Sequence, residues 1–135
     1  KDGKNPIVAH EFLGDSVEGK DVVVIDDMIS SGESMLDVAK KLKDRKARRV
    51  IVCTTFGLFT DGLEKFDEYY EKEYIYRVIT TNLSYRNPEL LTKPYYLEAD
   101  MSKYLASIMD ILNHDLSVEK VRSTTEKINR LLNRC

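Results

Sequence analysis

The sequence predicts an α/β fold with a mostly parallel sheet flanked by helices, and three features indicate it. Residues 22–25 are four consecutive β-branched residues, a run typical of a strand that is covered on both faces. Residues 50–53 form a second apolar run. Between the two runs, apolar residues recur at helical spacing from Met35 to Leu42. Strand, helix and strand within roughly 30 residues make a βαβ unit, whose two strands are parallel.

The end of this first helix contains a local misfit. The helix should end near Arg45, and glycine is the usual residue in the left-handed position that follows. Lys46 stands there instead. A positive φ at Lys46 would cost roughly 1 kcal/mol, although a positive charge at the negative end of a helix offsets part of that cost.

The rest of the chain alternates between strands and helices in the same way. Apolar spacing and turn residues predict strands at 7–9, 75–80 and 95–97, loops at 26–32, 56–59 and 88–94, and helices at 61–72, 101–113 and 118–132. We expect one domain over residues 1–115 and an extra C-terminal helical extension over residues 116–135.

Composition and charge exclude several classes of protein. The chain has 135 residues, of which 42% are hydrophobic, and this suits one ordinary core. No apolar run approaches the roughly 18 residues of a membrane span, and a net charge of −2 gives no broad positive field for nucleic acid.

Cys53 and Cys135 have neither CxxC nor metal-ligand spacing. Nothing requires an oxidising compartment, so we expect a cytoplasmic protein. His10 and His114 are isolated from each other, and we expect ordinary surface or core histidines rather than ligands.

Residues 26–34 carry the informative chemistry. They read Asp-Asp-Met-Ile-Ser-Ser-Gly-Glu-Ser and lie at the carboxyl end of the first predicted strand, where open α/β sheets bind ligands. Backbone N–H groups of residues 30–34 can surround an anion, and Gly32 allows close approach. The following helix directs its positive end at the same point, and Ser31 and Ser34 add hydroxyl donors. This arrangement suits a phosphate monoester.

The two acids before this loop point to a second part of the ligand. Asp26 and Asp27 would repel a phosphate beside them, so they make sense only if they face something else. A carboxylate accepts two hydrogen bonds from vicinal hydroxyls, and a divalent cation could also join acid and ligand. A diol at one end and a phosphate at the other describe ribose 5-phosphate. The alternative is an ordinary strand–turn–helix, because Asp, Ser and Gly are common turn residues; the complete ordered string favours the ligand site.

Residues 22–34 resemble the phosphoribosyl-pyrophosphate motif of type I phosphoribosyltransferases, a family that includes the ribose-phosphate pyrophosphokinases. Three flanking segments are similar to the pyrophosphokinases in particular. They are Phe12 to Lys20, similar to xxGDVxGK, Ala47 to Val50, similar to GAKRV, and Thr55 to Thr60, similar to THGLFS. The resemblance covers about residues 5–112.

The resemblance implies the C-terminal half of an enzyme that has two such halves. This kind of enzyme is a transferase of nucleotide biosynthesis that moves a pyrophosphoryl group from Mg-ATP to O1 of ribose 5-phosphate, forming phosphoribosyl pyrophosphate. Positioning and charge neutralisation should dominate such a transfer. The implied partners are the N-terminal half of the same enzyme and further copies in a homo-oligomer, with no nucleic acid and no membrane.

The resemblance also implies roles for individual residues. Asp26 would hold the ribose hydroxyls, and Asp27 would support the same region. The 5-phosphate would be held by Ser30, Ser31, Gly32, Glu33 and Ser34. Catalytic residues and metal ligands would lie outside this chain, which alone would bind neither Mg²⁺ nor ATP strongly.

Three features depart from the family pattern. Glu33 stands where the family often has Gly, which places an acid near the expected phosphate, and Phe56 replaces the usual His. The family's catalytic Lys-Arg-Arg loop should lie at or before Lys1, and Lys1 and Lys4 do not match it. The chain starts with Lys rather than Met. We therefore expect an excised piece that binds ribose phosphate without turning it over.

Two rival functions stay open. A phosphoribosyltransferase would add a base or an amine to the activated sugar, but it needs a hood over the base and a flexible loop, and neither is evident in the sequence. A non-catalytic homologue would bind sugar phosphates to regulate a partner. Upstream sequence would separate these, because a second α/β half indicates the pyrophosphokinase and a DNA-binding module indicates the regulator.

Overall fold

The structure is a computed structural model, and it describes residues 14–115, 117 and 125–133. The chain divides into two compact units, Lys1–Ala99 and Asp100–Cys135. The expected division at residues 115 and 116 remains a prediction. Among the described residues, no helix is long and apolar enough to cross a membrane.

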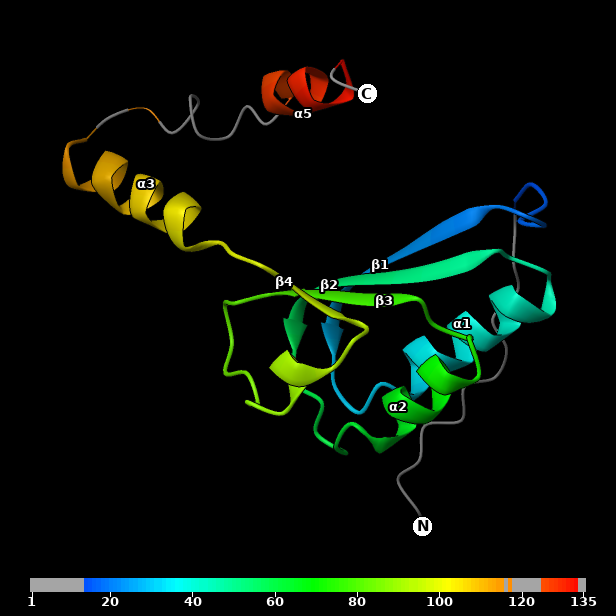
Figure 1. The fold of residues 1–135 in the computed structure, drawn as a ribbon. Helices are drawn as coiled ribbons and strands as arrows, with labels where there is room; N and C mark the ends of the chain where they lie inside the picture. The colour runs from blue at the N-terminus through cyan, green and yellow to red at the C-terminus, as the bar shows by residue number, and fades with distance from the viewer. Residues whose placement is uncertain (1–13, 116, 118–124, 134–135) are drawn as a thin grey trace, which may run out of the picture. The chain divides into compact units, whose positions relative to one another are not determined.

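The first unit is built on a four-stranded sheet in which every strand pairs in parallel with its neighbour (Figure 1). The order is sequential, and the strands are β1 (Asp21–Ile29), β2 (Arg49–Gly57), β3 (Arg77–Thr81) and β4 (Tyr96–Ala99). The register aligns Val24 with Val52, Val52 with Val78, and Val78 with Tyr96. The predicted α/β class with a mostly parallel sheet is confirmed.

Two helices, α1 (Glu33–Asp44) and α2 (Glu64–Glu71), lie on the same side of this sheet (Figure 1). A single 3-10 turn, η1 (Leu90–Thr92), interrupts the long connection from β3 to β4. The core fills the space between the sheet and the helices. Its buried side chains include Met35, Leu36, Ala39, Leu42, Val50, Val52, Phe66, Val78, Leu90 and Tyr95.

The other face of the sheet carries an aligned apolar row. Ile25 lies opposite Cys53, Cys53 opposite Ile79, and Ile79 opposite Leu97. Ile25 is 81% exposed and Leu97 is 48% exposed. The prediction of a first strand covered on both faces is therefore wrong for the described part of this unit. Each βαβ step moves across the sheet in one direction with the same hand, so both crossover helices fall on one face.

The first two strands are longer than the apolar runs that predicted them. Parallel pairing continues past the acids, with Asp26 opposite Thr54, and ends only where Ile29 meets Gly57. The predicted loop at 26–32 is thus wrong in its first four residues, and the one at 56–59 in its first two. Backbone pairing between neighbouring strands continues whatever the polarity of the side chains, so hydropathy alone marks the strand ends too early.

The remaining bounds differ from expectation by a few residues. Helix α2 begins at Glu64 rather than 61, after Gly62 with φ +84. Strand β3 begins at Arg77 rather than 75, and the chain reaches it through Glu73, which has φ +58. Such left-handed residues reverse the chain within a short connection.

Lys46 adopts the left-handed conformation that its position predicts, with φ +64. The amide of Ala47 donates to the carbonyl of Leu42 at 3.1 Å, and that of Lys46 to the carbonyl of Lys43 at 2.8 Å. These bonds satisfy the last carbonyl groups of α1. The Lys46 ammonium also lies 3.0 Å from a carboxylate oxygen of Glu18.

The second unit contains helices α3 (Ser102–Asn113) and α5 (Thr125–Leu132). The predicted helix at 101–113 is confirmed. The helix predicted at 118–132 is observed over its later part, and residues 118–124 lie outside the described residues, as does the strand predicted at 7–9.

Candidate oxyanion site

The connection from β1 to α1 is a tight turn at the carboxyl end of the sheet. Gly32 has φ +87 and forms the amino-terminal cap position of α1, where its carbonyl accepts a 2.9 Å hydrogen bond from the amide of Leu36. A Cβ at Gly32 would lie 2.4 Å from Cζ of Phe66. Glycine is therefore required both by its conformation and by the ring against it.

This turn surrounds a small hollow of about 160 Å³. It is lined by Asp26, Met28, Ile29, Ser30, Ser31, Gly32, Glu33, Ser34 and Met35. Six of the seven residues predicted to bind substrate thus lie around one hollow, and Asp27 is the exception. The first turn of the 12-residue α1 opens at the same place, so the positive end of the helix dipole favours an anion there.

The two aspartates differ in their relation to this hollow. Asp26, which is aligned with the buried Thr54, lines it, whereas Asp27 is not among the residues that line it. The amide of Asp27 donates a 2.8 Å hydrogen bond to Oδ1 of Asp26.

The acid of the turn is paired. Glu33 accepts a hydrogen bond from the ammonium of Lys65, with Oε1 and Nζ 2.7 Å apart. This bond, together with the negative charges of Glu33 and Asp61, raises the pKa of Lys65. The backbone amide of Glu33 lies 3.4 Å from Oγ of Ser31. Lys65 was not among the predicted site residues, because it is 32 positions away and no local pattern joins it to the turn.

The connection from β2 to α2 is hydrogen-bonded to the β1–α1 turn and supports it. The amide of Leu58 donates to the carbonyl of Ile29 at 2.8 Å, and that of Thr60 to the carbonyl of Ser30 at 3.0 Å. Phe59 and Phe66 meet edge to face, with ring centres 5.0 Å apart. Residues 55–60 resemble a motif of the family, but the sequence alone indicated no role for them. These contacts show that the segment supports the β1–α1 turn.

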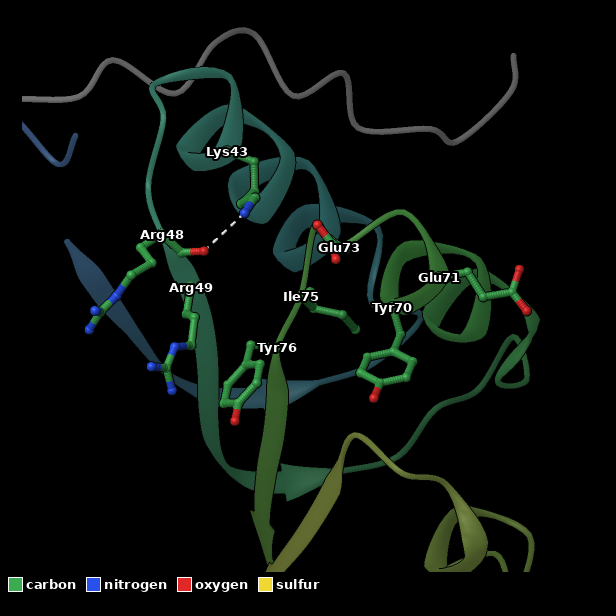
Figure 2. Close-up of a pocket in the computed structure, with 8 residues that line it drawn as sticks. All are labelled: Lys43, Arg48, Arg49, Tyr70, Glu71, Glu73, Ile75 and Tyr76. Carbon is green, nitrogen blue, oxygen red and sulfur yellow. Dashed lines mark hydrogen bonds between the residues drawn. The ribbon is translucent and has the colours of Figure 1, made fainter. Parts of the chain in front are cut away.

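A larger hollow, of about 520 Å³, lies at the opposite end of the strands (Figure 2). Its three basic side chains already have partners within the chain. The Lys43 ammonium donates to the carbonyl of Arg48 at 3.0 Å, Arg48 is 2.6 Å from Oδ2 of Asp21, and Arg49 lies 4.9 Å from the ring centre of Tyr76 (Figure 2 shows Lys43, both arginines and Tyr76). We therefore place the candidate site at the β1–α1 turn, where a helix begins and six of the predicted residues line one hollow. Within the described residues, no group of three or more His, Cys, Asp or Glu side chains could hold a metal ion.

Comparison with known proteins identifies the family of this fold. The family model described as "Phosphoribosyl transferase domain" matches residues 3–93. The chain is 30% identical over 112 residues to a ribose-phosphate pyrophosphokinase of Shewanella oneidensis, covering 83% of this chain and 34% of that protein. It is 42% identical over 57 residues to the ribose-phosphate pyrophosphokinase of Corynebacterium efficiens, covering 42% of this chain and 17% of that protein.

A solved structure leads to the same fold. The phosphoribosylpyrophosphate synthetase of Mycobacterium smegmatis superimposes with a TM-score of 0.65 at 20% identity, covering 76% of this chain and 33% of that one. The chain thus spans between about a sixth and a third of the length of these relatives. The resemblance to ribose-phosphate pyrophosphokinases is confirmed, and the chain belongs to the phosphoribosyl transferase domain family.

Proposed function

We propose that this chain is the ribose-5-phosphate-binding part of a ribose-phosphate pyrophosphokinase. The observation that carries the proposal is the shared hollow, in which Asp26 and the turn from Ser30 to Ser34 line the same space at the mouth of α1. The 160 Å³ of this space suits a phosphate group better than a complete nucleotide.

Each part of the sugar phosphate has a group to meet it. Main-chain amides at the start of α1 and the hydroxyls of Ser31 and Ser34 would hold the 5-phosphate. The carboxylate of Asp26 would accept hydrogen bonds from the ribose hydroxyls. Asp27 would support this carboxylate through its amide, which already donates to Asp26 Oδ1.

In the complete enzyme, the bound sugar would receive a pyrophosphoryl group from Mg-ATP at O1, giving phosphoribosyl pyrophosphate. We propose that Mg²⁺ and ATP are held mainly by the other half of the enzyme, and that this chain alone binds neither strongly. The chain's own task is to fix the sugar by both ends, which orients O1 for the transfer. Catalytic groups and the nucleotide site would come from the N-terminal half of the enzyme. We also propose a homo-oligomer in the cytoplasm, and no turnover by this chain alone.

Calorimetry with ribose 5-phosphate tests the proposal. We expect Asp26→Asn and Ser31→Ala each to weaken binding by roughly 1 to 3 kcal/mol, because each removes a charged or buried hydrogen bond. Asp44→Asn, at the far end of α1, is the matched control and should bind like the wild type. Loss of affinity in the control, or none in the two site variants, would contradict the proposed site.

A second ligand separates the two halves of the site. Ribose 5-phosphate and 2-deoxyribose 5-phosphate differ by one hydroxyl of the diol. If Asp26 holds the diol, the wild type should prefer ribose 5-phosphate, and Asp26→Asn should lose most of that preference. An ATP-dependent synthesis assay completes the test, since product formation by this chain alone would contradict the expected lack of turnover.

A phosphoribosyltransferase is the second candidate, because the matched family model is described by that activity. Both functions need the same phosphate turn. They differ in the preferred sugar, since a transferase should bind phosphoribosyl pyrophosphate far more tightly than ribose 5-phosphate in the presence of Mg²⁺.

A further inference from the structure

An acid lies within the proposed phosphate site. Glu33 is the first residue of α1 and lines the small hollow together with the serines of the turn. A carboxylate near a phosphate dianion repels it, and the repulsion is strong where water is partly excluded. The site therefore needs something that removes the effect of this charge.

Lys65 meets that acid from another element. It belongs to the first turn of α2, and its ammonium lies 2.7 Å from Oε1 of Glu33. Glu33 also lines a second, neighbouring hollow, in which Lys65 takes part; Lys65 is not among the residues that line the first. The ion pair therefore places the Glu33 carboxylate beside Lys65, which lines the second hollow but not the first.

Lys65 is held in place by its neighbours. Phe66, the next residue, is fully buried against Gly32 of the turn. The Thr60 amide, four residues before α2, is bonded to the carbonyl of Ser30. The start of α2 and the phosphate turn therefore form one packed assembly, and Lys65 faces Glu33 as a consequence of that packing.

The pair itself contributes little to stability. The Lys65 side chain is 50% exposed and that of Glu33 is 60% exposed, and exposed ion pairs stabilise proteins only slightly. The ion pair should instead affect the affinity of the turn for an anion.

We propose that Lys65 is a positioning residue that neutralises Glu33 and turns its carboxylate out of the hollow, so that the turn accepts a phosphate dianion. This inference rests on the proposed function in naming ribose 5-phosphate as the ligand. Its electrostatic content applies to any phosphate bound at the turn.

Four variants of the full chain test the proposal by calorimetry with ribose 5-phosphate. Lys65→Met should weaken binding about five- to tenfold, because Glu33 is left unpaired beside the ligand. Lys65→Arg should restore affinity to within about twofold of the wild type, since it keeps the charge. The double variant Glu33→Gln with Lys65→Met should regain most of the affinity that Lys65→Met loses, because no acid remains to be neutralised. Lys72→Met removes the same charge from the Glu68 ion pair at the other end of α2 and should leave binding unchanged.

The outcomes separate this inference from the proposed function. Affinity of Lys65→Met equal to that of the wild type overturns the inference. Weak binding by the double variant also overturns it, because Lys65 would then contact the phosphate directly. Inorganic phosphate, followed by ³¹P line broadening, serves as a second probe on the same variants. If the wild type binds ribose 5-phosphate no more tightly than inorganic phosphate, the proposed function is contradicted. The Lys65 inference is then decided by the affinities of the same variants for inorganic phosphate. If neither ligand binds the wild type, both fall. Thermal melting of each variant confirms that it is folded.

Discussion

Gly32 and Phe66 are packed so closely that no side chain fits between them: a Cβ on Gly32 would lie 2.4 Å from Cζ of the ring. The contact joins the turn that lines the candidate site to the helix that supports it. Phe66 is completely buried and meets Phe59 edge to face. The shape of the site is therefore set by a core contact as well as by its own hydrogen bonds.

Gly32→Ala should be strongly destabilising. The methyl group meets the Phe66 ring, and the residue must also keep φ at +87. Overpacking typically costs about 1 to 3 kcal/mol and the left-handed conformation roughly 1 to 2 kcal/mol, so we expect a loss of about 2 to 5 kcal/mol in urea unfolding. Gly19→Ala is the matched control, because Gly19 has φ +70 but no atom within 4 Å of its Cβ position. It should lose only the conformational part. Equal losses in the two variants would show that the Phe66 contact contributes nothing.

A partly buried hydrogen bond attaches the chain before β4 to α2. The hydroxyl of Tyr95 donates to Oδ1 of Asp67 at 2.9 Å, and the Lys93 ammonium lies 2.7 Å from Oδ2. Tyr95 is 1% exposed. Tyr95→Phe removes one bond to a charged acceptor without changing the packing, so the free energy of unfolding should fall by about 1.5 to 3 kcal/mol. Tyr85→Phe, at a position 83% exposed, should be neutral; a comparable loss there would argue against a specific role for the hydrogen bond to Asp67.

The same tyrosine predicts a dependence of stability on alkaline pH. Burial, and then the hydrogen bond to Asp67, raise the pKa of Tyr95 well above its ordinary value of 10.0. Between about pH 10 and the raised pKa, the unfolded chain has lost this proton and the native chain keeps it, so stability falls as pH rises. Urea midpoints measured from about pH 8 to pH 11 should decline more steeply for the wild type than for Tyr95→Phe. Parallel curves would mean that Tyr95 ionises in the native protein as easily as in the unfolded one.

The spacing of apolar residues was sufficient to predict the strands and helices, but not which face of the sheet the helices cover. The runs at 22–25 and 50–53 mark β1 and β2 because buried parallel strands are continuously apolar. The same runs do not say which face a helix covers, and Ile25 is 81% exposed. That face depends on the direction in which successive crossovers step across the sheet.

The sequence predicts the candidate site as one continuous segment. The arrangement of that segment in space also depends on the backbone and on residues that are distant in the sequence. Asp26 and Asp27 are neighbours in sequence, yet only Asp26 is among the residues that line the hollow. Ser30 to Ser34 lie around one hollow, as a turn at the mouth of a helix should. Lys65 could not be predicted, because its contact with Glu33 follows from the packing of α2 against the turn.

Lys46 offers a stabilising change. The predicted positive φ of Lys46 is confirmed, with an observed value of +64. Lys46 follows the last turn of α1, and its amide donates to the carbonyl of Lys43. Lys46→Gly should keep that hydrogen bond while removing the clash of Cβ with the backbone, which costs roughly 1 kcal/mol or more. The exposed ion pair with Glu18 would be lost, and such pairs contribute little.

We therefore expect Lys46→Gly to raise the free energy of unfolding by about 0.5 to 1 kcal/mol, measured by urea unfolding. Lys40→Gly is the control within α1, where glycine should destabilise by roughly 1 kcal/mol because the helical conformation gains nothing from it. If both changes destabilise, the left-handed strain at Lys46 is smaller than the unfolded-chain entropy that glycine adds. Opposite signs for the same substitution six residues apart would show that the position beyond a helix end, rather than the residue type, decides the outcome.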